Sequence, residues 1–242
     1  MCVLNWFFNA DYPIEAIGGA PANSTRYWYY RPESRQLIID FWAKMAEHFA
    51  GLPRDDVAYD LLNEPAFLDP VPYNDFIKDA TAAIREHDKT HRIFVESANG
   101  WAQPEDFDWL EATGDRNTIY EFHFYGPHTH DSYQHDIWFP RLERDRETFL
   151  SEESLEERLL PPLRFSIRSG GAELCHGEFG ITFLGPGEAP RRWLKSLLTL
   201  HEKHDIHWFW WNWQGDEIHR TGLVAGERVN PLVRTLREFM AR

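Results

Sequence analysis

The stretch Val57-Ala58-Tyr59-Asp60-Leu61-Leu62-Asn63-Glu64-Pro65 decides the predicted fold class. Its apolar run predicts a buried strand over 57–62, which ends abruptly in Asn63, Glu64 and Pro65. A β/α barrel carries its chemistry on residues at the carboxyl ends of buried strands. A second glutamate, Glu178, stands in a similar setting in Leu174-Cys175-His176-Gly177-Glu178-Phe179-Gly180. We therefore interpret the rest of the chain as the frame that brings Glu64 and Glu178 together.

Strand-like and helix-like segments alternate along the whole chain, which predicts an α/β fold of parallel βαβ units. We count six strand–helix units, so the prediction is a (β/α)8 TIM-barrel type that is incomplete, since a closed barrel has eight. The absence of repeats and of linker composition predicts one domain over residues 1–242. The predicted strands are 2–8, 57–62, 92–96, 118–124, 172–176 and 207–213. The predicted helices are 32–50, 73–87, 105–112, 152–169 with a break at Pro161-Pro162, 190–204 and 231–241.

Composition excludes several classes of partner. The formal net charge of −14 argues against nucleic acid and against an anionic membrane, because both attract basic surfaces. No apolar run of about 18 residues indicates a membrane span. The amino terminus lacks the features of a signal peptide, and the sequence leaves localisation open. Cys2 and Cys175 cannot form a disulfide framework, and we expect both to be buried free thiols.

Two strand-terminal glutamates are what a glycosidase with two catalytic carboxyl groups requires. Retaining hydrolysis uses one carboxylic acid to protonate the leaving oxygen and a second carboxylate, about 5–5.5 Å away, to attack the anomeric carbon. A solvated surface role is the ordinary alternative for a glutamate. Glu64 and Glu178 differ from that pattern because each follows an apolar run and each is flanked by proline or glycine.

Five segments together resemble one known family. They are Phe41–Phe49 leading to the first strand end, Asn63-Glu64-Pro65, His123-Phe124-Tyr125, Gly177-Glu178-Phe179-Gly180 and Trp208-Phe209-Trp210-Trp211-Asn212-Trp213. In this order they resemble the family 5 glycoside hydrolases, retaining enzymes of the cellulase type. The resemblance runs from about Cys2 to the end of the chain. It implies hydrolysis of a β-linked polysaccharide or oligosaccharide without a cofactor.

The resemblance also implies roles for individual residues. Glu64 would be the general acid/base and Glu178 the nucleophile. Asn63 would bind the 2-hydroxyl of the sugar, Tyr125 would donate a hydrogen bond to the nucleophile, and His123 would contact the site around it. These are the substrate-binding residues that we expect beside the two catalytic glutamates.

Tryptophans supply the remaining candidates. The resemblance matches Trp211 best to the family's platform under the reacting sugar. Period-two alternation puts Phe209, Trp211 and Trp213 on one face of the strand, but it does not say which face points inward. Trp101 could line a neighbouring subsite or could simply pack within its loop.

The histidines His123, His128, His130 and His135 invite a metal-site interpretation, because a His-X-His pair can chelate. No cysteine or carboxylate stands at the spacing of a tetrahedral site, so we predict no metal and a polar loop instead.

The sequence departs from the family at its beginning. The segment Cys2–Phe8 resembles the family's third strand, so the first two strand–helix units and their arginine have no counterpart. Trp6, Phe7 and Phe8 stand where the family often has a histidine. We expect a truncated start, which would leave a strand edge open to self-association and weaken solubility or activity. The long segment Asn9–Pro32 or oligomerisation would be the alternative way to close the gap.

The predicted function is therefore retaining hydrolysis of β-glycosidic bonds, with β-1,4-glucan as the first substrate, as in an endoglucanase. Alternatives within the family are β-mannanase, β-1,3-glucanase and β-glucosidase activity. A catalytically weakened barrel that only binds carbohydrate is the alternative outside the enzymes.

Overall fold

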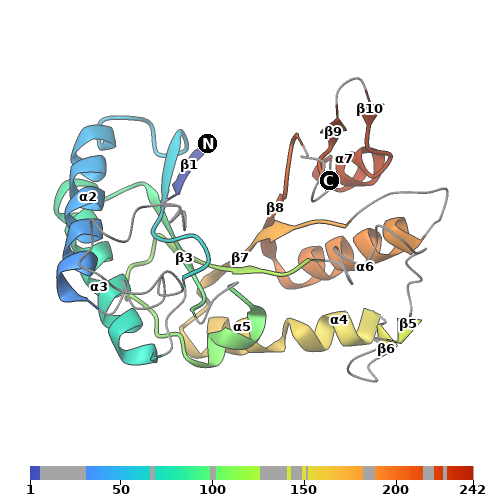
Figure 1. Ribbon diagram of the computed structural model, residues 1–242, viewed down its shortest axis with the longest axis horizontal. Helices are drawn as coiled ribbons and strands as arrows, with labels where there is room; N and C mark the ends of the chain where they lie inside the picture. Colours follow the sequence, from blue (N-terminus) through green and yellow to red (C-terminus); the bar gives the residue numbers. More distant parts are fainter. Residues whose placement is uncertain are drawn as a thin grey trace, which may run out of the picture. The chain divides into compact units, whose positions relative to one another are not determined.

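The computed structural model describes residues 1–5, 31–65, 69–98, 102–125, 141–142, 149–150, 152–181, 189–214, 221–225 and 228–241. Six strands follow the order β1-β2-β3-β4-β7-β8 (Figure 1). The pairs β1–β2, β2–β3, β3–β4 and β7–β8 are parallel. Helices separate these strands along the chain, which confirms the predicted alternation. The strands are β1 Cys2–Asn5, β2 Val57–Asp60, β3 Arg92–Glu96, β4 Thr118–His123, β7 Glu173–Phe179 and β8 Ile206–Trp210.

The chain divides into two compact units. The first comprises Met1–Phe122 and Arg164–Glu173, and the second comprises His123–Leu163 and Leu174–Arg242. The prediction of a single domain over 1–242 stays a prediction.

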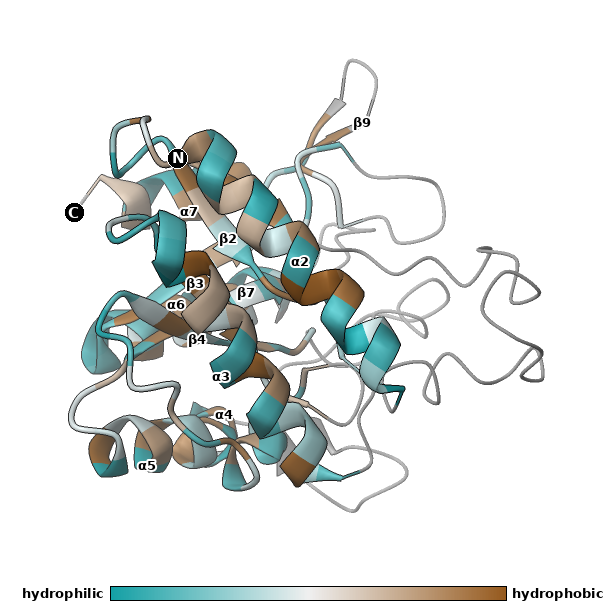
Figure 2. Cartoon of the chain, turned by 90° about the vertical axis from the view of Figure 1, so that its left-hand side faces the viewer, coloured by the Kyte–Doolittle hydropathy of each residue, from teal (hydrophilic) through white to brown (hydrophobic). Residues whose placement is uncertain are grey.

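In the first unit, helices α2 (Pro32–Phe49) and α3 (Pro70–His87) pack side by side (Figure 2). Ile38, Trp42 and Ala46 recur every four residues on α2, and all three are fully buried. The Trp42 ring meets the ring of Tyr59 on β2 edge to face at 5.9 Å. The apolar stripe of the helix therefore packs against the sheet as its spacing predicts.

Helix α3 begins three residues earlier than the predicted start at Tyr73. Asp69 caps it, since its side chain accepts a hydrogen bond from the backbone N–H of Val71 at 3.0 Å. Proline is tolerated in a first helical turn because the N–H groups there have no partner inside the helix. The 3-10 helix η2 (Pro104–Asp108) replaces the helix predicted over 105–112.

The helix predicted over 152–169 is broken, as expected. It forms α4 (Glu152–Arg158) and α5 (Leu160–Arg168). The break falls at Leu159, just before Pro161 and Pro162, because both prolines occupy the first turn of α5, where they fit best.

In the second unit, helix α6 (Ala189–His204) packs on β8, α4 and α7 (Val233–Met240). Its residues Trp193, Leu194, Leu197 and Leu198 are fully buried. Two short antiparallel pairs complete the described elements: β5 (Arg141–Leu142) with β6 (Phe149–Leu150), and β9 (Val224–Ala225) with β10 (Arg228–Val229).

The cysteine prediction is half right. Both thiols are free, but only Cys175 is buried. Cys2 is exposed because it lies at the start of β1, a strand with β2 as its one neighbour in the described sheet. Among the described helices, none has the length and apolar character needed to cross a membrane.

Candidate active site

Glu64 lies four residues beyond the end of β2, in the first unit. Leu61 and Leu62, which connect it to the strand, are 1% exposed, so the predicted apolar run stays buried although the strand itself ends at Asp60. The indole N–H of Trp42 donates to the carbonyl of Leu61 at 3.1 Å. Asn63 and Glu64 then emerge as half-buried residues. The chain thus reaches Glu64 on a segment that is anchored along its length.

The backbone of Glu64 has φ 45°, in the left-handed region that favours glycine. Its N–H donates to Glu96 Oε2 at 2.6 Å. Glu96 is 1% exposed at the end of β3, and its own carbonyl accepts a hydrogen bond from the Tyr73 hydroxyl at 2.5 Å. A buried carboxylate therefore fixes the amide of the candidate acid/base.

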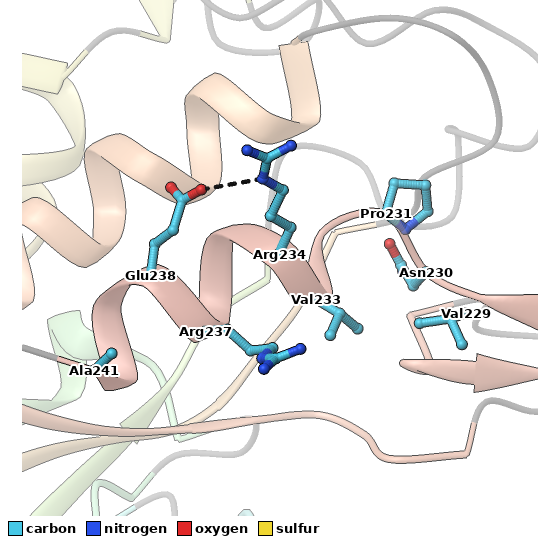
Figure 3. A pocket seen from close by; sticks show the side chains of 8 residues that line it. All are labelled: Val229, Asn230, Pro231, Val233, Arg234, Arg237, Glu238 and Ala241. Atoms are coloured by element: carbon cyan, nitrogen blue, oxygen red, sulfur yellow. Dashed lines mark ion pairs between the residues drawn. The ribbon is translucent and has the colours of Figure 1, made fainter.

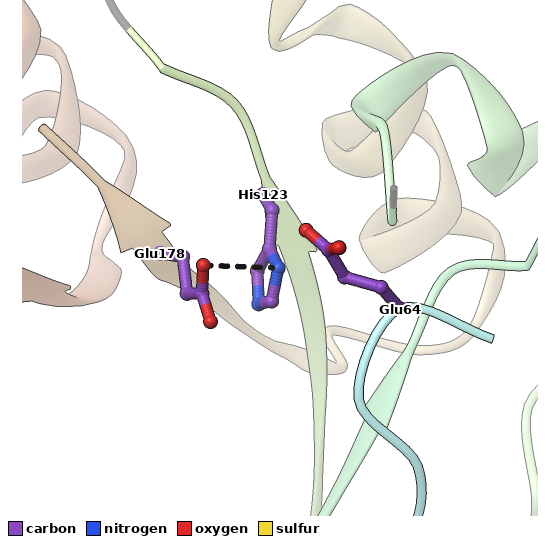
Figure 4. A group of neighbouring side chains, drawn as sticks. All are labelled: Glu64, His123 and Glu178. Atoms are coloured by element: carbon purple, nitrogen blue, oxygen red, sulfur yellow. Dashed lines mark ion pairs between the residues drawn. The ribbon is translucent and has the colours of Figure 1, made fainter. Parts of the chain in front are cut away.

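Glu178 lies on β7, in the second unit, and its side chain is 14% exposed. Tyr125 donates its hydroxyl hydrogen bond to Glu178 Oε2 at 2.5 Å. His123 Nδ1 lies 3.9 Å from the same oxygen (Figure 4). The structure therefore brings together three of the predicted residues, and the predicted Tyr125–Glu178 hydrogen bond is present.

A β-bulge sets the direction of Glu178. The strand was predicted to end at His176, but it continues through Phe179. His176 pairs with Trp208 and Phe179 pairs with Trp210, so three steps along β7 face two steps along β8. The extra residue places the rings of His176 and Phe179 next to each other at 4.8 Å. A bulge of this kind re-aims the side chain that it carries.

The aromatic strand follows the predicted alternation. Phe209, Trp211 and Trp213 are 38%, 40% and 73% exposed, whereas Trp208 and Trp210 are half-buried with rings 5.8 and 5.4 Å from Phe179. Three aromatic side chains of the segment 208–213 therefore face solvent.

Trp211 lies against the residues that surround Glu178. The backbone N–H of Trp211 donates to the carbonyl of Phe179 at 2.9 Å. The backbone carbonyl oxygen of Trp211 lies so near Gly180 that a Cβ added to this glycine would be 2.8 Å from it. Only glycine permits this approach. The glycine that follows the candidate nucleophile therefore has a packing reason.

Some of the residues that the sequence singled out lie outside the described residues: Trp101, and the loop histidines His128, His130 and His135. Within the first unit, the carboxylates of Glu96 and Glu121 have oxygens within 4.8 Å of each other. Two carboxylates offer fewer oxygens than a Ca²⁺ site takes, so this pair alone does not define a metal centre.

A pocket of about 730 Å³ lies beside α7 (Figure 3). Arg234, which pairs with Glu238 at 3.4 Å, and Arg237 contribute its cations. None of the predicted site residues lines this pocket.

Sequence reasoning missed Glu96 and His176. Glu96 ends a buried strand, as Glu64 nearly does, so its position carried the same signal. His176 stands in the segment 174–180, directly before Gly177, but received no role.

Comparison with known proteins gives consistent matches. The model of the cellulase family, described as glycosyl hydrolase family 5, matches residues 9–217. Endoglucanase C of Acetivibrio thermocellus is 24% identical over 239 residues, which cover 87% of this chain and 68% of that protein.

Two solved structures of Cel5A from Thermotoga maritima share the fold. The structure in complex with cellobiose has a TM-score of 0.71 at 19% identity, and covers 98% of this chain and 71% of that one. The structure in complex with mannotriose has a TM-score of 0.69 at 18% identity, and covers 94% and 68%. With six strands in the described order, these matches confirm the incomplete (β/α)8 barrel fold.

Proposed function

The chain belongs to glycosyl hydrolase family 5 and is a glycoside hydrolase, and we propose that it cleaves β-glycosidic bonds with retention, using Glu64 and Glu178 as its two catalytic carboxyl groups. The observation that carries the proposal is the environment of Glu178, which receives a 2.5 Å hydrogen bond from Tyr125. A phenol that donates to a carboxylate favours its ionised form, which is the form that attacks an anomeric carbon.

In this proposal Glu178 attacks the anomeric carbon and forms a covalent glycosyl-enzyme. Glu64 first donates a proton to the leaving oxygen, and then removes a proton from the water that hydrolyses the intermediate. Asn63, which directly precedes Glu64, binds the 2-hydroxyl of the reacting sugar, where a hydrogen bond strengthens in the transition state. The mechanism uses only side chains and water.

The proposed substrate is β-1,4-glucan. The name of the Acetivibrio relative and the cellobiose complex of the Thermotoga enzyme support this choice. The exposed rings of Trp211, Phe209 and Trp213 support binding of an oligosaccharide, because aromatic rings pack well on the apolar faces of sugars. The mannotriose complex supports β-mannan as the second candidate.

The test compares Glu178→Gln and Glu64→Gln on an aryl β-cellobioside, with Glu173→Gln as the matched control on the same strand β7. We expect both active-site variants to keep the wild-type circular dichroism spectrum and to lose nearly all turnover. The Glu173 variant should hydrolyse the substrate normally. Near-normal turnover by Glu178→Gln would overturn the proposal.

Chemical rescue separates the two roles. In Glu178→Ala, added azide should replace the nucleophile and give a glycosyl azide of inverted configuration. In Glu64→Ala, azide should instead attack the glycosyl-enzyme and give a product of retained configuration. The opposite assignment of products would exchange the roles of the two glutamates. Hydrolysis of β-glucan against β-mannan then identifies the substrate.

A further inference from the structure

The proposed mechanism gives no role to two buried histidines of the second unit. His176 precedes Glu178 by two residues on β7, and His201 lies on α6. Their rings are linked by a 3.1 Å contact between His176 Nδ1 and His201 Nε2. Both residues are at most 1% exposed. Because buried polar groups need partners, the surroundings of these rings limit where their protons can lie.

Two arrangements of protons keep the hydrogen bond between the two rings. His176 Nε2 lies 3.0 Å from the carbonyl of Phe124 and 3.1 Å from the backbone nitrogen of the same residue. In one arrangement His201 Nε2–H donates to His176 Nδ1, and His176 Nε2–H donates to that carbonyl. In the other, the Phe124 N–H donates to His176 Nε2, and His176 Nδ1–H donates to His201 Nε2. Both arrangements tie His201 to the backbone of Phe124 through His176.

Burial favours this neutral pair. It lowers the pKa of His201 to about 3. The pKa of His176 is also held well below its usual value. Burial is the largest cause and the nearby His201 ring the next, while the hydrogen bond with Phe124 opposes the shift. Both rings are therefore uncharged at neutral pH, and each can donate only one hydrogen bond.

The pair reaches the candidate nucleophile through Phe124. The Phe124 ring stacks on the His176 ring at 4.4 Å, and the Arg158 guanidinium lies 4.9 Å from the centre of the same phenyl ring. The next residue, Tyr125, donates to Glu178. Hydrogen bonds therefore link His201 to His176 and His176 to the backbone of Phe124, which directly precedes Tyr125 of the Tyr125–Glu178 pair.

We propose that His201 and His176 form a relay of hydrogen bonds that positions Tyr125 against Glu178. The relay rests on the proposed role of Glu178 as nucleophile. Both histidines are positioning residues, since neither contacts the reacting sugar in this scheme. His176 shares β7 with Glu178 and also holds the backbone that carries Tyr125, so it fixes both partners of that hydrogen bond.

The experiment compares His201→Gln with His201→Leu. The glutamine amide can still form a hydrogen bond with His176 Nδ1, as donor or as acceptor, whereas leucine cannot. We expect His201→Leu to lower kcat about tenfold, with KM changed by less than about twofold, because one hydrogen bond is lost away from the substrate. His201→Gln should recover most of kcat. His204→Gln, one turn further along α6, is the control and should match the wild type.

A spectroscopic measurement tests the relay without activity. In long-range ¹H–¹⁵N spectra of histidine-labelled protein, His176 and His201 should carry their protons on the same nitrogen, both on Nε2 or both on Nδ1. Only these combinations place one proton between His176 Nδ1 and His201 Nε2. Different tautomers at the two rings would overturn the relay, and this holds even if His201→Leu fails to fold. Equal kcat values for the leucine and glutamine variants would also overturn the relay.

The two proposals fail separately. If Glu178→Gln retains turnover, the assignment of the nucleophile is wrong, whatever the tautomers are. If Glu178→Gln is inactive while His201→Leu retains full kcat, the nucleophile stands and the relay is wrong.

Discussion

Stability in acid should depend on His201, because this side chain is buried without charge. Its pKa is lowered to about 3 by burial, whereas an unfolded chain gives histidine a pKa of about 6.5. Between these two values the unfolded state binds more protons than the folded state, so the free energy of unfolding falls as the pH falls from 6.5 toward 3. The linkage relation gives a loss of about 2 kcal/mol between pH 7 and pH 5 from this group alone.

The perturbation is His201→Gln, which removes the titrating ring but keeps a hydrogen-bonding group for His176. Urea unfolding, followed by tryptophan fluorescence at pH 7, 6 and 5, should show a wild-type stability that falls with pH. The variant should lose about 2 kcal/mol less over the same interval. His176 still titrates in the variant, so the pH dependence should become shallower without disappearing. His87→Gln, at an exposed position, controls for the substitution itself.

The reasoning would be refuted by a variant whose stability falls with pH as steeply as that of the wild type. That outcome would mean that His201 releases its proton in the folded protein as it does in the unfolded chain. It would also remove the support that burial gives to the relay.

Three further predictions concern single contacts. Tyr125→Phe removes the 2.5 Å hydrogen bond to Glu178. Because a hydrogen bond to a charged group is lost, kcat should fall about 10- to 100-fold in steady-state assays. A change in kcat within about twofold would contradict this. Gly180→Ala puts a Cβ 2.8 Å from the carbonyl oxygen of Trp211. The free energy of unfolding measured in urea should therefore fall by about 1–3 kcal/mol. An unchanged midpoint of urea unfolding would speak against the close approach. Burial raises the pKa of Asp88, but hydrogen bonds from its neighbours outweigh burial and hold that pKa below its usual value. The Asp88 carboxylate therefore stabilises the folded protein above about pH 4, and this contribution is lost as the pH falls further. Asp88→Asn should therefore be less stable than the wild type at pH 7, and a difference that stays constant down to pH 3 would exclude this origin.

The positions of the strands could be predicted because burial leaves a simple pattern in the sequence. The run 57–62 is apolar apart from Asp60, as expected for a strand with both faces covered, and all six of its residues are buried. The hydrogen-bonded strand nevertheless ends at Asp60. Hydrophobicity reports removal from water, and it does not report where the pairing of two backbones stops.

The bulge in β7 could not be predicted for a related reason. Strict alternation would put His176 and Glu178 on one face of the strand, because side chains repeat every two residues. The pairing with β8 shifts by one residue between His176 and Phe179, and the alternation changes there. Gly177 is compatible with a bulge, with a strand end and with a loop, so the sequence leaves these three open. The direction of the candidate nucleophile therefore follows from the pairing of β7 with β8.

The backbone of Glu64 gives an argument for its role that does not depend on relatives. The left-handed backbone conformation of Glu64 costs about 1–2 kcal/mol for a residue with a side chain, whereas glycine adopts it without this cost. The chain holds Glu64 there through its N–H bond to Glu96, and Tyr73 in turn anchors the carbonyl of Glu96. Stability alone would be better served by glycine at position 64. Glu64 nevertheless places a carboxylate at this strained position, and the buried carboxylate of Glu96 holds its backbone there. A catalytic role for the Glu64 carboxylate explains this arrangement. The strain at Glu64 thus supports its assignment as the acid/base independently of the resemblance that first suggested it.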